Sequence, residues 1–142
     1  MPVVFELDRE TRVVHSRAWG AVTEPELMRH VTGIRARFDD GILDATWVQL
    51  LDFSDVTSVA DLSTADIRHL ASVNPWPSTA LRVFIMLSPE VYGLGRMYQS
   101  MVGAASDRIH IVRSFPAALT LLASQRYDRF KLDEKAGLST AT

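Results

Sequence analysis

Residues 81–90 read LRVFIMLSPE, and this stretch decides the fold. Its first seven residues form the most apolar run of the chain, which is typical of a strand buried on both faces of a sheet. Ser88-Pro89-Glu90 follows with an N-cap serine, a proline and an acidic residue, which together predict the start of a helix. A buried strand that leads directly into a helix is the repeating unit of an α/β protein.

The same alternation continues on both sides of this stretch. Upstream, residues 47–51 predict a buried strand, and Ser63-Thr64-Ala65-Asp66 predicts the capped start of a helix. Downstream, residues 108–113 predict the last strand, and Ser114-Phe115-Pro116 predicts the start of the last helix. Because strands alternate with helices, we expect a sheet that is largely parallel.

The N-terminal part adds a hairpin and the first helix. Two β-rich runs, residues 3–7 and 12–19, are separated by four polar residues and predict two antiparallel strands. Thr23-Glu24-Pro25-Glu26 has the pattern of a capping box, and an apolar helical stripe follows it. The element order is therefore ββαβαβαβα, which predicts an α/β fold with a mixed, mostly parallel five-stranded sheet and helices packed on it.

Composition limits the class of protein. Hydrophobic residues make up 47% of the 142-residue chain, which suffices for one core, so we expect a single domain over residues 1–125. Residues 126–142 read as a polar C-terminal extension with a frayed end.

The 15 basic residues against 17 acidic ones argue against a nucleic-acid partner. Cysteine is absent, which excludes disulfides and thiolate chemistry. With no signal-peptide pattern and no apolar run long enough to span a membrane, we expect a cytoplasmic protein.

Serines stand at three predicted strand-to-helix junctions, at the sheet edge where α/β proteins bind ligands. Ser63, Ser88 and Ser114 each precede a helix, where free backbone N–H groups attract an anion, and Arg113 is available to help. The simpler interpretation is that all three serines are ordinary N-caps, and we favour it.

Three aspartates follow the strand predicted over residues 47–51. Asp52, Asp55 and Asp61 together offer the oxygen ligands that Mg²⁺ prefers. Aspartate is also an ordinary turn residue, and no phosphate-binding loop accompanies these three. We therefore predict no metal site.

The predicted third helix has an unusual composition. Gly93 and Gly95 lie inside it, and a mid-helix glycine costs about 1 kcal/mol relative to alanine, so a close approach of another group is expected there. Tyr92, Arg96 and Gln99 share one side of this helix. Residues of this helix and of the junctions form one candidate surface for a ligand or partner: Asp52, Asp55, Ser88, Tyr92, Arg96, Gln99, Arg113 and Ser114.

Histidine patterns are weak. Glu26 and His30 are four residues apart on one predicted helix, and Asp66 and His69 are three apart on another. Either pair could supply two metal ligands, but we expect both pairs to be solvated. No nucleophile elbow, zinc-protease motif or phosphate loop is present, so we predict no catalytic residue, no cofactor and no enzymatic activity.

Three stretches carry a resemblance to a known family. Residues 13–20 (VVHSRAWG), 51–57 (LDFSDVT) and 92–99 (YGLGRMYQ) resemble the small bacterial SpoIIAA-like proteins, which are STAS-type domains. The resemblance implies β-α units on a mixed sheet. STAS-type anti-sigma-factor antagonists carry an Asp-Ser-Ser-Gly motif in which a kinase phosphorylates a serine. Here the stretch is Asp61-Leu62-Ser63-Thr64, where Asp61 and Ser63 match the motif while Leu62 and Thr64 depart from it.

Two functional hypotheses follow. The first is a non-enzymatic interaction or regulatory module, phosphorylated at Ser63, whose partner is a kinase or another regulator. The second is a binder of a small apolar or lipid-like ligand, by analogy with CRAL–TRIO lipid-transfer domains. It rests on Met97, Tyr98 and Met101 of the third helix and on Trp76 in a proline-flanked loop that could close over a ligand. A homodimer is a further hypothesis, because exposed strand edges need covering.

Overall fold

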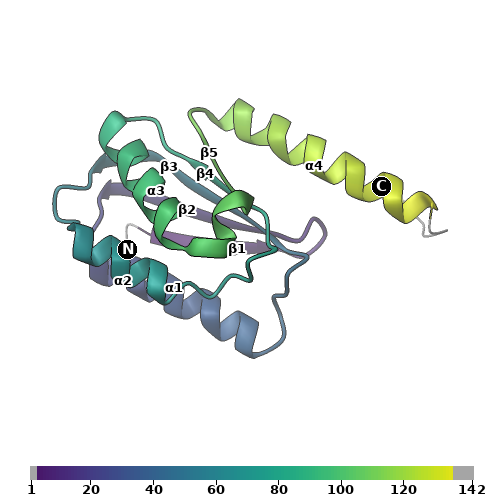
Figure 1. Ribbon diagram of the computed structural model, residues 1–142, viewed down its shortest axis with the longest axis horizontal. Coiled ribbons are helices and arrows are strands. Elements are labelled where there is room, and N and C mark those ends of the chain that lie inside the picture. Colours follow the sequence, from purple (N-terminus) through teal and green to yellow (C-terminus); the bar gives the residue numbers. More distant parts are fainter. Residues whose placement is uncertain (1–2, 136–142) are drawn as a thin grey trace.

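The computed structural model describes the backbone of residues 3–135 and the side chains of residues 3–125. It shows an α/β fold with a five-stranded mixed sheet and helices, as the sequence predicts (Figure 1). The elements are β1 (Val3–Asp8), β2 (Val13–Ala21), α1 (Glu24–Asp39), β3 (Val48–Ser58), α2 (Thr64–Ser72), β4 (Arg82–Ile85), α3 (Pro89–Met101), the 3-10 helix η1 (Gly103–Arg108), β5 (Ile109–Val112) and α4 (Phe115–Lys135).

The strands lie side by side in chain order, β1-β2-β3-β4-β5. β1 pairs antiparallel with β2, which confirms the predicted hairpin, and the other neighbours pair in parallel. The run expected to be buried on both faces forms β4, which lies inside the sheet between β3 and β5 and is buried along its whole length. The register places Gln49 beside Arg82 and Leu51 beside Phe84, which matters for the site described below.

Helices cover both faces of the sheet, but unequally. On one face, side chains from α1, α2 and α3 form the apolar core with Phe53, Phe84 and Met86. On the other face, Ala118 and Leu122 of α4 pack on side chains of β3 and β4, including Val83 and Ile85. In Figure 1, α4 extends well beyond the sheet, away from α1 and α2. The strand side chains that face α1, α2 and α3 therefore lie in a different environment from those that face α4.

Local sequence signals explain where the helices begin. Ser63 accepts a hydrogen bond from the backbone N–H of Asp66, and the Asp66 carboxylate accepts the backbone N–H of Ser63, which completes a capping box. Ser88 and Ser114 cap α3 and α4 in the same way, by accepting the backbone N–H groups of Val91 and Ala117. All three junction serines therefore serve as N-caps, the interpretation that we favoured.

Two boundaries differ from the sequence prediction. β3 continues to Ser58, well past residue 51, because its pairing with β2 extends to Ala21. α4 continues to Lys135, so residue 125 lies inside a helix. The expected frayed tail, residues 136–142, lies outside the described residues.

The two glycines of α3 have different surroundings. A Cβ atom at Gly95 would overlap the sulfur of Met86, so glycine at this position lets α3 approach β4 and its C-terminal extension closely. A Cβ atom at Gly93 would meet nothing within 4 Å. The expected close approach therefore exists at Gly95 only.

None of the helices within residues 3–135 combines the length and the apolarity that a membrane span requires.

Candidate functional site

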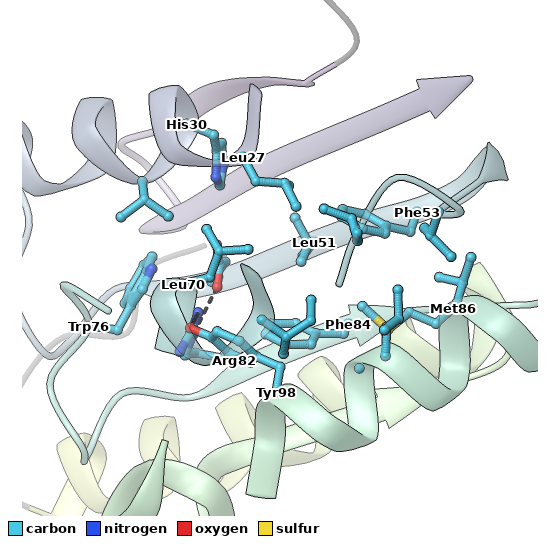
Figure 2. A pocket seen from close by; sticks show the side chains of 18 of the residues that line it. Leu27, His30, Leu51, Phe53, Leu70, Trp76, Arg82, Phe84, Met86 and Tyr98 are labelled. Carbon is cyan, nitrogen blue, oxygen red and sulfur yellow. Dashed lines mark hydrogen bonds between the residues drawn. The ribbon is translucent and has the colours of Figure 1, made fainter. Parts of the chain in front are cut away.

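A cavity of about 90 Å³ lies between the sheet and the helices α1, α2 and α3 (Figure 2). Protein interiors are close-packed, and few of their voids exceed one water molecule. This cavity has about three times the volume that one water occupies in the liquid. We therefore treat it as the candidate ligand site.

The cavity is bounded by strands on one side and helices on the others. Its floor comes from alternate residues of β3 and β4, and its walls come from the three helices and two loops. The lining side chains are Leu27, His30, Val31 and Ile34 of α1, Gln49, Leu51 and Phe53 of β3, Val59 and Leu62 of the following loop, Ile67 and Leu70 of α2, Pro75 and Trp76, Arg82, Phe84 and Met86 from β4 onward, and Val91, Leu94 and Tyr98 of α3, with Gly95 between them.

The two ends of the cavity differ in polarity. Polar groups gather where β3 and β4 begin, at Gln49 and Arg82, with His30 above them on α1. Figure 2 shows Trp76, Arg82 and Tyr98 at this end, and Phe53 and Met86 at the opposite end. From Gln49 to Phe53 the strand advances about 13 Å. The cavity is thus elongated and amphipathic.

Arg82 dominates the polar end. Its side chain is buried, with only 4% of the residue exposed. Its Nε donates to Gln49 Oε1 at 2.8 Å, its Nη1 to Asn74 Oδ1 at 3.0 Å and its Nη2 to the Tyr98 hydroxyl at 3.0 Å. All three acceptors are neutral, so the guanidinium is held in position without a counter-ion from them.

His30 is a second buried polar side chain at this end. Its Nε2 lies 2.7 Å from Ser16 Oγ on β2, and its ring packs edge-on against Phe5. Burial, and to a smaller extent the charge of Arg82, lowers the pKa of His30 from 6.5 to about 4. His30 is therefore a neutral imidazole at neutral pH and adds no charge to the site.

Trp76 closes the polar end from the loop between α2 and β4. Its ring is 4% exposed and meets Phe38 of α1 edge-on, with the ring centroids 5.0 Å apart. Asn74 accepts the backbone N–H of Trp76, which fixes the turn that carries the indole inward. The sequence hypothesis treats Trp76 as a lid that closes over a ligand. In this structure Trp76 is part of the cavity wall.

The structure disperses the three aspartates that the sequence placed in one junction. Asp52 and Asp55 lie within β3, since that strand is longer than expected. Asp52 accepts hydrogen bonds from the backbone and hydroxyl of Ser54, and Asp55 forms an exposed ion pair with Arg17 at 3.2 Å. Asp61 is exposed in the following loop. Across the described residues, no three acidic or histidine side chains are grouped in a way that could hold a metal ion.

The predicted ligand or partner surface on α3 divides into two parts. The Arg113 guanidinium lies 4.5 Å from the centroid of the Tyr92 ring and donates to the carbonyl of Leu87. Arg96 instead donates to Gln99, whose amide nitrogen donates to the carbonyls of Ser106 and Ile109. The first group thus contacts the loop between β4 and α3, and the second contacts η1 and the start of β5.

The candidate phosphorylation region is exposed but structurally engaged. Asp61, Ser63 and Thr64 all lie at the surface near the start of α2. The Ser63 hydroxyl accepts the Asp66 backbone N–H and so stabilises the start of that helix. Phosphorylation of Ser63 remains a prediction from the family resemblance.

Sequence reasoning missed the residues that give the cavity its character. It treated Arg82 and Gln49 only as members of apolar strands, although a charged residue within LRVFIML was a visible signal. It expected Glu26 and His30 to form a solvated pair, which is wrong for His30. His30 is 8% exposed because α1 turns it toward Ser16. Of the three side chains of this helix expected in an apolar ligand site, Tyr98 lines the cavity, whereas Met97 and Met101 do not.

The sequence matches no protein-family model and no curated protein. The likeness to SpoIIAA-like proteins therefore stays a prediction from the three quoted stretches.

Proposed function

We propose that this protein is a non-enzymatic binding domain that takes a small apolar molecule into the cavity beneath α1, α2 and α3. The observation that supports this most directly is the cavity itself, about 90 Å³ within an otherwise buried core. An apolar cavity offers water few hydrogen-bond partners, whereas an apolar ligand regains the dispersion contacts that the void lacks.

The composition of the walls fits this role. Binding sites for small molecules are mostly apolar with a few polar groups that set orientation. Here the polar groups are confined to one end, and the remainder is aliphatic, aromatic and methionine side chains. Some lining residues, Val59, Leu62 and Leu94, are only half-buried, so the lining reaches the surface between the β3–α2 loop and α3.

Direct binding of a neutral probe tests the proposal. We suggest titrating the full chain with 1-butanol and following the methyl signals of leucine, valine and methionine by NMR. We expect saturable shifts at lining residues such as Leu51, Leu70 and Met86, and no comparable shifts at Leu119 on α4.

A cavity-filling variant distinguishes occupation of the cavity from surface adsorption. Val91 is buried and lines the apolar end, so Val91→Phe places a ring in the volume that the probe would take. Val4→Phe is the matched control, since Val4 is 42% exposed and does not line the cavity. Binding should be lost in V91F and kept in V4F, with urea unfolding showing that both fold. If 1-butanol gives no saturable shifts in the unaltered protein, the proposal is wrong.

A further inference from the structure

We infer that the natural ligand is a small carboxylate whose head group binds Arg82, an inference that rests on the function proposed above. The starting point is an unbalanced charge. Arg82 is buried, and no carboxylate from residues 3–125 forms an ion pair with it. Burying a cation is costly unless a counter-charge compensates for lost hydration. A ligand carboxylate would supply that counter-charge.

Arg82 also has hydrogen-bond donors to spare. A guanidinium carries five N–H donors, and three of them are used by Gln49, Asn74 and Tyr98. Each terminal nitrogen makes one of these bonds and therefore keeps one N–H. Two donors on one planar group match the two oxygens of a carboxylate.

The surroundings hold the guanidinium in place and leave the site electropositive. The rings of Trp76, Phe84 and Tyr98 lie 5.8, 5.3 and 5.3 Å from its central carbon, so aromatic faces support the cation. His30 is neutral, and the other polar groups at this end, Gln49 and Tyr98, are uncharged. The low polarity of the walls strengthens the attraction of Arg82 for an anion.

The rest of the cavity sets the size and shape of the ligand. Beyond Arg82 the floor continues through Leu51 and Phe84 to Phe53 and Met86, which suits a hydrocarbon tail. A dry cavity of about 150 Å³ is known to accept benzene, and this cavity, at about 90 Å³, is smaller. The chemistry that fits is a short aliphatic carboxylate rather than a long-chain fatty acid.

The test compares butanoate with 1-butanol, two probes with the same hydrocarbon chain and different head groups. At pH 7 we expect the full-length protein to bind butanoate roughly 10- to 100-fold more tightly, the range of a charge-assisted hydrogen bond. In the same titrations the ¹⁵N signal of Arg82 Nε should move with butanoate and stay unchanged with 1-butanol. This signal needs no variant, so it remains decisive if substitutions at Arg82 impair folding.

Two variants test whether Arg82 causes the preference for butanoate over 1-butanol. Arg82→Met keeps an unbranched apolar stem and removes the charged guanidinium, so it should abolish the preference for butanoate while 1-butanol still binds. Arg68→Met makes the same change at an exposed position on α2 and should keep the preference.

The outcomes separate the two proposals. Equal binding of butanoate and 1-butanol, or a preference that survives in R82M, overturns the inference and leaves the binding function standing. If 1-butanol does not bind, the proposed function and the inference that rests on it are both wrong.

Discussion

Strand β4 presents Val83 and Ile85 to the helix α4, and Arg82 and Phe84 to the cavity beneath α1, α2 and α3. On the α4 side, Val83 and Ile85 have no exposed surface and pack against Ala118 and Leu122. On the cavity side, a charged group lies beside the cavity of about 90 Å³.

This difference separates a close-packed face from a face with a cavity, which we propose as a binding site. Both faces bury apolar side chains that stabilise the fold. The cavity face also contains a cavity, which forfeits dispersion contacts, and a buried charge, which opposes folding. The alternation of side chains along a strand lets adjacent residues serve the two purposes. Changes on either face should therefore affect stability, and changes on the cavity face should also affect binding and pH dependence.

The largest effect is expected on the close-packed face. Ile85→Ala removes three carbon atoms from a fully buried position and should lower the free energy of unfolding by about 4 kcal/mol. Urea unfolding measures this loss. Leu119→Ala, also on α4's side of the molecule but 49% exposed, should cost no more than about 0.5 kcal/mol. A cost of 1 kcal/mol or less for I85A would contradict close packing on this face.

The next effect concerns the cavity face and acidic pH. The folded state holds His30 neutral down to its pKa of about 4, whereas the unfolded chain takes up this proton near pH 6.5. Because the unfolded state binds more protons between these values, stability should be complete above pH 6.5 and fall by about 3 kcal/mol by pH 4. Urea unfolding at a series of pH values measures the loss.

Two substitutions test whether His30 is responsible. His30→Gln removes the titrating group, so most of the stability difference between pH 7 and pH 4 should disappear. His110 is the control, because burial and then Arg108 lower its pKa as well, with a shift of the same sign. His110→Gln should leave the larger part of the pH dependence in place. An unchanged pH dependence in H30Q would show that His30 is not the group that titrates.

The smallest effect concerns the start of α2, one wall of the cavity. Ser63→Ala removes the hydroxyl that accepts the Asp66 N–H at 3.1 Å and should destabilise the protein by about 1 kcal/mol. Ser78→Ala, at an exposed position between α2 and β4, should leave stability within about 0.5 kcal/mol. Neither change should alter 1-butanol binding, and weaker binding in S63A would mean that the cap also determines the cavity.

The fold could be predicted from local sequence patterns, because each helix begins with its own capping residues. Ser63, Ser88 and Ser114 were placed at the beginnings of helices from sequence, and each one accepts a capping hydrogen bond there. The end of β3 could not be predicted from the sequence, because aspartate, which occupies positions 52 and 55, is a common turn residue. Pairing with β2 holds them in a strand despite that preference.

The sequence pointed to Tyr98 and Trp76 as parts of an apolar ligand site, but the position and volume of the cavity could not be predicted, for a different reason. Periodicity shows which side chains share a face, but the volume left between them depends on register and helix placement. Gln49 meets Arg82 only through the pairing of β3 with β4, and Trp76 reaches the same place from a loop. The clue available in the sequence was the single charge within residues 81–87, which an apolar strand carries only when something stabilises it.

The order of the strands also bears on how the chain folds as it is made. Since neighbours in the sheet are neighbours in the sequence, each new strand emerges beside a partner already synthesised, and no pairing awaits a distant segment. Every residue that lines the cavity lies between Leu27 and Tyr98. The ribosome has thus produced the complete lining before it reaches β5 and α4, whose arrival then covers Val83 and Ile85 on the opposite face.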